Sequence, residues 1–295
     1  MLTIFSVPKP FTGSTADLQR NAIQSWQRLE PKPEIILCGD DPSIESEATV
    51  LGVKSLGNLA FSPYGTPLLN SVFSKGHEIA IFPILCYANA DIIFFQDLVD
   101  AVRRIHFDQY LAVGQRTDLD LTHGLDFSHS NWALDLRTEV QEKGHLHSIF
   151  GIDYFIFTAD SGLHKLPPFA VGRPRWDNWF IFNARKNGIP VVDITRVCQV
   201  VHQNHDYAHI PHWKGQGWSG PETDHNTQLY YQLIGDYIHH CNIQDATHLL
   251  TAQRLLTAIS KNYLFNRLQT TAMFKPTLRP LAKLIRDFYK NKEIT

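Results

Sequence analysis

The Asn-Ala-Asp triplet at positions 89–91 places an ionisable side chain at the end of an apolar segment. Residues 84–88 (Ile-Leu-Cys-Tyr-Ala) predict a buried strand, and a second apolar run follows from Ile92. A carboxylate in apolar surroundings is costly unless a cation or hydrogen-bond donors compensate it. Mg²⁺ and Mn²⁺ prefer carboxylate and phosphate oxygens, so Asp91 is a candidate ligand for a cation that bridges to a diphosphate. The simpler alternative for an isolated triplet is that Asp91 caps a neighbouring turn.

A second candidate carboxylate, Asp177, lies between two tryptophans in the segment 171–179 (Val-Gly-Arg-Pro-Arg-Trp-Asp-Asn-Trp). Trp176 and Trp179 could stack on the apolar faces of sugars, and Asp177 could accept a proton from a hydroxyl group. Arg173 could contact a diphosphate as a bidentate donor. The alternative is that Asp177 caps the helix that follows it and that the tryptophans are packing residues.

A histidine, His202, comes directly after a predicted strand at 196–201. Three further histidines follow at short spacings: His205, His209 and His212. On a helix such a group could bind zinc, but Pro211 and the polar residues around it favour a loop. The position after a core strand favours a functional role for His202 over a purely structural one.

The elements that must position these side chains alternate between strands and helices. Strands are predicted at 2–7, 34–38 and 84–88, with helices at about 15–29 and 66–73 between them. The apolar residues of these strands are continuous rather than alternating, which is typical of a mostly parallel sheet covered on both faces. In such sheets ligands bind where the carboxyl ends of the strands meet loops. The polar residues at these strand ends are Lys9, Asp40, Asp41 and Asp91.

The pattern changes in the last quarter of the chain. Further strands are predicted at 110–114, 153–158 and 190–192, whereas the C-terminal part predicts helices at 228–241, 246–260 and 278–289. Before these helices, the tryptophans and glycines of residues 205–226 predict a mobile aromatic lid. We therefore expect an α/β domain over residues 1–225 and a helical region over residues 226–295.

The overall composition is that of a folded protein, with 43% hydrophobic residues and a net charge of −2, which gives no reason to expect nucleic-acid binding. The charge is uneven, because residues 261–295 contain eight Lys and Arg against two Asp and Glu. This basic segment is either a solvated helix face or a peripheral contact with anionic lipid.

The predicted compartment is the cytoplasm, with peripheral contact at the inner membrane face left open. The four cysteines are widely spaced and form no Cys-x-x-Cys pair, which favours buried free thiols. The apolar stretch at 79–93 is interrupted by polar residues and proline, so no transmembrane helix is predicted, and residues 1–5 do not resemble a signal peptide.

Together these motifs resemble those of GT-A-fold glycosyltransferases, particularly the family 2-like nucleotide-sugar transferases, and the element order is similar over about the first 205 residues. The triplet resembles the DxD region of that family, with Asn89 in place of the first acidic residue. The resemblance implies that Asp91 binds Mn²⁺ or Mg²⁺ on the donor diphosphate, with Asn89 and Ala90 beside the donor. It implies that His202 is a further metal ligand and that Asp177 deprotonates the acceptor hydroxyl, as in inverting enzymes.

The same resemblance implies a nucleoside site formed by Val7, Lys9 and Asp40, with Gly65 near the nucleotide and Arg173 on the diphosphate. Ordinary turn chemistry at residues 39–42 is the alternative for Asp40. The implied activity is hexosyl transfer from a nucleoside diphosphate sugar, with UDP favoured, to a hydroxyl of a carbohydrate or glycolipid. Such a reaction belongs to polysaccharide or glycoconjugate biosynthesis.

Two other functions remain open at this point. A sugar nucleotidyltransferase would carry a glycine-rich basic loop after the first strand, where this chain has residues 7–11 (Val-Pro-Lys-Pro-Phe). A nonenzymatic carbohydrate- or nucleotide-binding protein would use the aromatic residues but would need neither a metal carboxylate nor a base. The sequence gives no indication of the oligomeric state.

Overall fold

The computed structural model describes residues 1–121, 124–204 and 219–292. The predicted lid at 205–226 therefore lies largely outside the described residues. The histidines at 205, 209 and 212 lie wholly outside them. The strands are β1 (Leu2–Ser6), β2 (Glu34–Cys38), β3 (Lys54–Leu56), β4 (Ile84–Ala88), β5 (Ile92–Phe94), β6 (Leu111–Val113), β7 (Thr117–Leu119), β8 (His145–Leu146), β9 (Tyr154–Thr158), β10 (Val191–Asp193), β11 (Val200–Gln203), β12 (His248–Leu250) and β13 (Leu255–Thr257). The helices are α1 (Gly13–Gln27), α2 (Pro42–Leu51), α3 (Leu69–Ile79), α4 (Asp97–Arg103), α5 (Trp132–Lys143), α6 (Trp176–Lys186), α7 (Pro221–Ile234), α8 (Lys261–Phe274) and α9 (Arg279–Lys292).

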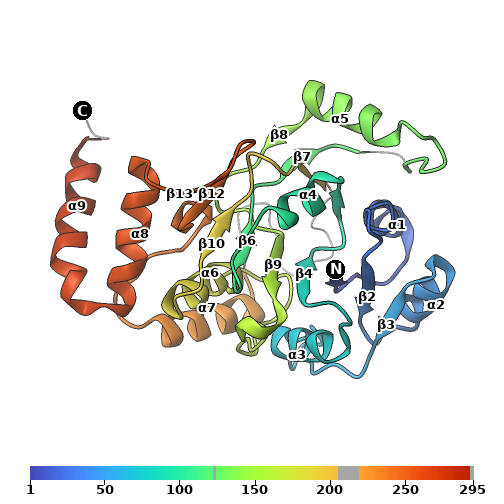
Figure 1. Ribbon diagram of the computed structural model, residues 1–295. Helices are drawn as coiled ribbons and strands as arrows, with labels where there is room; N and C mark the ends of the chain where they lie inside the picture. The colour runs from blue at the N-terminus through green and yellow to red at the C-terminus, as the bar shows by residue number, and fades with distance from the viewer. Residues whose placement is uncertain (122–123, 205–218, 293–295) are drawn as a thin grey trace.

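A large, mostly parallel sheet forms the centre of the molecule, in the order β13-β12-β10-β6-β9-β4-β1-β2-β3 (Figure 1). Strands β3, β2, β1 and β4 pair in parallel, as do β6, β10 and β12, while β9 runs antiparallel between β4 and β6. The predicted α/β fold class is confirmed.

Apolar layers cover both faces of this sheet, because successive side chains of a strand point to opposite sides. In β1, Phe5 joins the layer with residues of α3, α6 and α7, and Ile4 joins the layer with residues of α1, α2 and α4. All five residues of β1, β2 and β9 are buried. Strands buried on both faces favour apolar residues on both faces, which accounts for the largely continuous apolar runs in the sequence.

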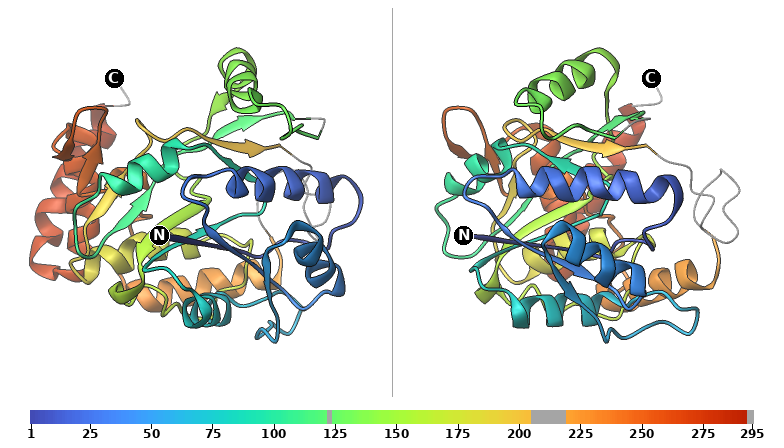
Figure 2. Two further views of the ribbon diagram at one scale, coloured as in Figure 1. Left: turned by 45° about the vertical axis from the view of Figure 1, so that its right-hand side comes forward. Right: turned by 90° about the vertical axis from the view of Figure 1, so that its right-hand side faces the viewer.

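A second, smaller sheet has the order β5-β11-β7-β8. Figure 2 shows this sheet and α5 stacked on one side of the molecule, with α1 between them and the N-terminal strands. Trp26 of α1 fixes this arrangement by donating a hydrogen bond from Nε1 to the backbone oxygen of Ile92 at 2.8 Å. The registers place His202 of β11 opposite Asp118 of β7 and opposite Ile92 of β5. The small sheet thus brings together segments that are distant in the sequence, and its β5 directly follows β4 of the central sheet.

The C-terminal part differs from its prediction at residues 246–260, where the expected helix is wrong. These residues form a hairpin of β12 and β13, and β12 pairs in parallel with the edge strand β10. The paired leucines at 249–250 and 255–256 suit a helix or a strand, and the open edge of β10 supplies backbone partners that favour the strand. Helices α8 and α9 lie together at one end of the sheet (Figure 1, left). The proposed boundary at 225/226 falls within α7 and stays a prediction.

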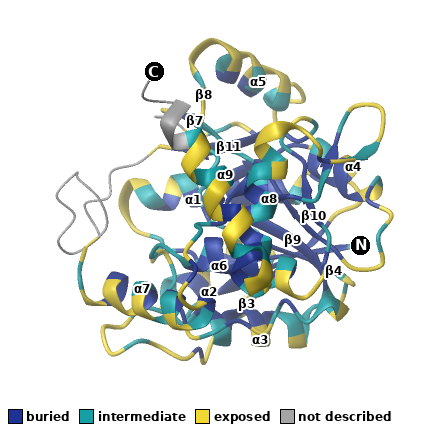
Figure 3. Ribbon diagram, turned by 90° about the vertical axis from the view of Figure 1, so that its left-hand side faces the viewer, coloured by how far each residue is buried: buried dark blue, intermediate teal, exposed yellow. Residues whose placement is uncertain are grey.

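Helix α9 carries most of the lysines and arginines of the basic segment 261–295 and is strongly amphipathic. Leu281, Leu284 and Phe288 are respectively 48%, 69% and 56% exposed, whereas Ala282 is buried. Figure 3 shows that α9 presents mostly exposed and half-buried residues. Within the described residues, no helix combines the length and apolar character needed to span a bilayer.

Candidate active site

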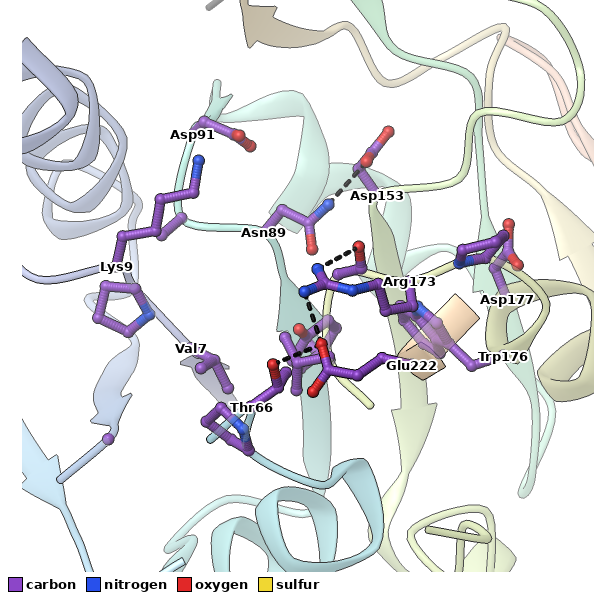
Figure 4. Close-up of a pocket in the computed structure, with 18 of the residues that line it drawn as sticks. Val7, Lys9, Thr66, Asn89, Asp91, Asp153, Arg173, Trp176, Asp177 and Glu222 are labelled. Carbon is purple, nitrogen blue, oxygen red and sulfur yellow. Dashed lines mark hydrogen bonds and ion pairs between the residues drawn. The ribbon is translucent and has the colours of Figure 1, made fainter. Parts of the chain in front are cut away.

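A cavity of about 1190 Å³ opens where the carboxyl ends of β1, β2 and β4 meet their loops. Its position agrees with the rule that ligands bind at this edge of an α/β sheet. All ten residues predicted to form a site line this one cavity, several of them shown in Figure 4. They are Val7, Lys9, Asp40, Gly65, Asn89, Ala90, Asp91, Arg173, Asp177 and His202.

The segment after β1 is fixed by Gln19 of α1. The backbone N–H of Lys9 donates to Oε1 of Gln19 at 2.6 Å, and Nε2 of Gln19 donates back to the Lys9 carbonyl at 3.0 Å. Gln19 is buried, so both bonds lie away from bulk water. With its backbone held, Lys9 extends its amine toward Asp91 (Figure 4).

The carboxylate of Asp40 stabilises the loop after β3. It accepts hydrogen bonds from the backbone N–H groups of Asn58 and of Leu59, the latter at 2.9 Å. Asp41, its neighbour, accepts from Ser43 at the start of α2. The expected turn chemistry is therefore present at this strand end, and a base contact by Asp40 stays a prediction.

Gly65 has a φ of 85°, which glycine adopts without strain. It closes a turn in which its N–H donates to the Ser62 carbonyl at 3.0 Å. Residues of this turn also bind Glu222 of α7, which accepts from Ser62 Oγ at 2.5 Å and from Thr66 Oγ1 at 2.9 Å.

The same Glu222 accepts from Nη2 of Arg173 at 2.6 Å (Figure 4). Arg173 was expected on a diphosphate, and in this structure its guanidinium is instead paired with a protein carboxylate. Its predicted contact with a diphosphate remains a prediction.

Asp91 and His202 lie side by side at the edge of the cavity, with His202 Nε2 3.7 Å from Asp91 Oδ2. His202 lies within β11 rather than after a strand, because β11 begins four residues later than predicted. Its Nδ1 is 3.1 Å from Oδ1 of Asp118. Burial disfavours the charged imidazole, but the carboxylates of Asp118 and Asp91 outweigh it and raise the pKa of His202.

Asp118 is the centre of a charged group behind His202. It accepts from Arg116 Nε at 2.8 Å and faces His147 Nδ1 at 2.6 Å. Burial alone would raise the pKa of Asp118, but His202, His147 and Arg116 hold it well below its usual range. A carboxylate behind a histidine fixes the orientation of the ring and raises its basicity, as in many metal sites. Sequence reasoning missed Asp118, because residues 117–147 show no periodicity that predicts β7.

Asn89 is oriented by a second missed residue, Asp153, which lies one residue before β9. Asn89 Nδ2 donates to Asp153 Oδ1 at 2.7 Å, and the Asn89 N–H donates to the Asp153 carbonyl at 2.9 Å. The other oxygen of Asp153 accepts from Arg116 at 2.5 Å. An aspartate at position 89 would face the Asp153 carboxylate directly. The asparagine in the triplet is therefore matched to a carboxylate that β9 supplies from the other side.

Asp177 lies in the first turn of α6, on the cavity side. Burial raises the pKa of Asp177 to about 6. Its Oδ1 is buried with no hydrogen-bond partner among the residues that the structure describes. The alternative that Asp177 caps α6 is wrong, because Arg175 occupies the capping position and α6 already begins at Trp176.

The two tryptophans beside Asp177 are mainly core residues. Trp176 lines the cavity but is 6% exposed and packs on Phe155 and Tyr87, with ring centroids 4.8 and 5.4 Å apart. Trp179 does not line the cavity and packs on Phe169. Stacking of Trp179 on a sugar is thus excluded in this structure.

No protein-family model matches the chain, and no curated protein matches it. The chain is similar to the crystal structure of S. aureus TarS 1-349 in complex with UDP-GlcNAc, with a TM-score of 0.49 and 9% identity over 79% of this chain and 66% of that one. GalNAc-T7 with UDP, GalNAc and Mn²⁺ gives a TM-score of 0.48 and 14% identity, over 78% of this chain and 50% of that one. A putative nucleotide-diphospho-sugar transferase from Desulfovibrio desulfuricans G20 gives 0.41 and 13%, over 78% and 96%. The chain thus spans 66% of the length of the TarS chain and 50% of the length of the GalNAc-T7 chain.

Proposed function

We propose that this protein is a GT-A-type glycosyltransferase that moves a hexosyl group from a nucleoside diphosphate sugar, with UDP as the expected nucleotide, to an acceptor hydroxyl. The observation that carries the proposal is the pair of Asp91 and His202, with Asp118 behind the histidine, at the edge of a cavity large enough for a nucleotide sugar. Typical ligand pockets measure about 300–1,000 Å³, so this cavity has room for a donor and part of an acceptor.

The residues at this edge fit a divalent cation. Asp91 offers a carboxylate oxygen and His202 offers Nε2, since Nδ1 faces Asp118. One carboxylate and one imidazole leave coordination positions for phosphate oxygens and water, which suits Mn²⁺ or Mg²⁺. When bound, the cation would neutralise the charge that develops on the departing diphosphate.

Asp177 supports a single-displacement reaction with inversion. Its carboxylate would accept the proton of the acceptor hydroxyl while the hydroxyl oxygen bonds to the anomeric carbon and the nucleoside diphosphate leaves with the bonding electrons. With a pKa of about 6, Asp177 is mostly ionised at neutral pH and close enough to that pH to act as a base. The acceptor would be a hydroxyl of a carbohydrate or glycolipid.

A panel of nucleoside diphosphates tests the donor site. UDP with Mn²⁺ should raise the melting temperature of the protein more than UDP or Mn²⁺ alone, because ligands that bind only the native state stabilise it. Asp91→Asn should remove the Mn²⁺-dependent part of the shift, and Asp135→Asn, on the exposed side of α5, should not. Equal UDP affinity in Asp91→Asn with Mn²⁺ would refute the metal assignment.

Incubation with a UDP-sugar separates the competing functions. A transferase should release UDP, slowly with water and faster with an acceptor. A nucleotidyltransferase would instead form pyrophosphate from UTP and a sugar phosphate. A nonenzymatic binding protein would bind the donor and release nothing.

We also propose that α9 rests on an anionic membrane surface, which would bring the site near a glycolipid acceptor. Leu281, Leu284 and Phe288 are exposed, and the same helix carries Lys283 and Arg286. An apolar stripe beside cations suits the interface of a bilayer that contains anionic lipid.

Co-sedimentation with vesicles tests this surface. The protein should bind vesicles containing phosphatidylglycerol better than pure phosphatidylcholine, and salt should weaken the binding. Leu284→Asp should weaken it by about 10-fold or more, since a buried leucine contributes about 1.5–3 kcal/mol. Val50→Asp, a similar change at an exposed position of α2, should not. Binding that ignores lipid charge and salt would rule out the electrostatic contact.

A further inference from the structure

Arg175 stands at the start of α6, two residues before Asp177, and lines the same cavity. Its backbone has a φ of 87°, a left-handed conformation that is rare for a residue with a long side chain. Such conformations cost of order 1–3 kcal/mol and persist where the surrounding structure requires them, often at ligand sites. Glycine or asparagine would fit this backbone more easily, so an arginine at this position indicates a functional role for its side chain.

The guanidinium of Arg175 has no carboxylate partner within salt-bridge distance among the residues of the described chain. Its Nη1 donates to Nδ1 of His240 at 3.3 Å, and its terminal carbon lies 6.0 Å from the ring centre of Tyr230. Its Nε is buried and makes no hydrogen bond to any described residue. By contrast, Arg173 and Arg116 in the same cavity each pair with a carboxylate. Arg175 therefore brings into the cavity a positive charge that forms no salt bridge with any described residue, although this charge partly offsets the burial that raises the pKa of Asp177.

His240 adds a neutral N–H donor beside the guanidinium of Arg175. Because its Nδ1 accepts from Arg175, the neutral ring carries its proton on Nε2. Burial, and then the charges of Arg175 and His239, lower the pKa of His240, so the ring stays neutral at pH 7. His240 also lines the cavity. The pair thus combines one full positive charge with N–H donors, and apart from the Nδ1 that Arg175 already occupies it presents no acceptor. This combination selects an oxyanion over a neutral or cationic group.

We propose that Arg175 and His240 form a binding site for an anionic group of the acceptor, a phosphate or a carboxylate placed near the hydroxyl that receives the sugar. This proposal rests on the proposed function, since Asp177 defines the acceptor side only if it is the base. The donor diphosphate belongs beside Asp91 and Lys9, at the ends of β4 and β1. An anion on Arg175 lies instead at the start of α6, on the same segment as Asp177. The acceptor class is accordingly a hydroxyl compound that carries a negative charge.

Titration with simple anions tests the site without turnover. Inorganic phosphate and acetate are titrated calorimetrically into the full chain with saturating UDP and Mg²⁺, which occupy the donor side. At least one anion should bind. Arg175→Gln should weaken the affinity for that anion by about 10-fold or more, because a charge-assisted hydrogen bond is lost. The preference between phosphate and acetate distinguishes a phosphorylated acceptor from a carboxylate acceptor. Arg254→Gln, an exposed arginine in the turn between β12 and β13, should leave the affinity unchanged.

Two further variants separate binding from folding. Arg175→Gly relieves the left-handed backbone, so it should fold with a melting temperature at least equal to that of the wild type and still lose the anion. Arg175→Lys keeps the charge but not the planar pair of donors, and it should retain part of the affinity. Anion affinity that is unchanged in Arg175→Gln and Arg175→Gly would overturn the proposal.

The failure of this proposal can be told apart from the failure of the proposed function. If Arg175→Gln weakens UDP as much as it weakens the anion, the arginine belongs to the donor and the acceptor assignment is overturned. If UDP does not bind the wild type at all, the proposed function fails, and an anion titration that depends on Arg175 still establishes the site. In a transfer assay, glycerol phosphate or glycerate should be a better acceptor than glycerol. Arg175→Gln should raise the KM of the charged acceptor by about 10-fold with little change in kcat.

Discussion

The two sides of the cavity differ in how their charged groups are compensated. Around Asp91, His202 and Asp118, each charge faces an opposite charge or a donor within 4 Å. Around α6, by contrast, Asp177 and Arg175 form no salt bridge with any described residue, and each keeps a buried polar atom without a hydrogen bond to one. The difference between the two sides lies in their ion pairs, since buried polar atoms without a hydrogen bond to a described residue occur on both sides. This difference supports the proposal that the protein preorganises a donor side around Asp91 and leaves an acceptor side around α6 to be completed by the substrate.

The largest effect is expected at the incomplete side. Asp177→Asn should lower kcat by about 10²- to 10⁴-fold, the range for loss of a general base, while UDP affinity stays near that of the wild type. In the wild type, kcat/KM should rise as the pH increases through about 6, because only the ionised carboxylate accepts a proton. The variant should lack this rise. Asp126→Asn, at an exposed turn, is the control. Near-normal turnover in Asp177→Asn would place the base elsewhere, or remove the need for one, as in a retaining enzyme.

On the side of Asp91 and His202, His202→Ala should weaken the affinity for UDP by about 10- to 100-fold in the presence of Mn²⁺. This is the range for loss of a supporting contact at a metal site. Without the metal, the affinity should not change. His145→Ala, an exposed histidine of the same small sheet, serves as the control. Weakening that is equal with and without Mn²⁺ would mean that His202 contacts the nucleotide or supports the fold.

Asp118→Asn should act in the same direction through His202, with a smaller effect of about 10-fold, the lower end of the range for residues behind a metal ligand. The asparagine can still face Nδ1 but no longer carries the charge that holds the imidazole. Calorimetric titration of Mn²⁺ measures this directly. If Asp118→Asn weakens Mn²⁺ binding more than His202→Ala does, Asp118 contributes more to the metal site than His202 and is itself a ligand.

The last prediction concerns stability rather than activity. Burial raises the pKa of Asp177 in the folded protein to about 6 from an ordinary value near 3.8. A raised carboxyl pKa means that the folded state binds the proton more tightly, so stability is lost as pH rises from about 4 to 6. About two pKa units correspond to about 3 kcal/mol, so Asp177→Asn should raise the melting temperature by about 6 °C or more at pH 7–8 and leave it unchanged near pH 4. A variant that melts lower than the wild type at pH 7 would show that the carboxylate stabilises α6.

The sequence predicted the composition of the cavity better than its internal contacts. Val7, Asp40 and Asp91 follow strands with continuous rather than alternating apolar residues. Parallel strands end at one edge of the sheet, so the meeting of these residues in space follows from the pattern. Arg173 and Asp177 also line this cavity, although no periodicity relates them to the first three strands. Their roles in binding and catalysis stay predictions.

Contacts that depend on short strands could not be predicted. Strand β7 has three residues and β11 has four, too few for a periodic pattern, so Asp118 and the true position of His202 in its strand were missed. The hairpin at 246–260 was missed because its pairing partner, β10, lies more than fifty residues earlier in the chain. In both cases the decisive partner is distant in sequence, and local propensity carries little information about it.

The contact between Asn89 and Asp153 has an evolutionary consequence. The contact joins one amide, at position 89, and one carboxylate, at position 153, and either position could carry the acid. Two acids would repel each other at 2.7 Å. Two amides would leave Arg116 with one fewer anion. The two positions should therefore covary among descendants of a common ancestor, with the acid passing between the triplet and the residue just before β9. A search that requires an acidic residue at the first position of the triplet would overlook every lineage in which that exchange has taken place.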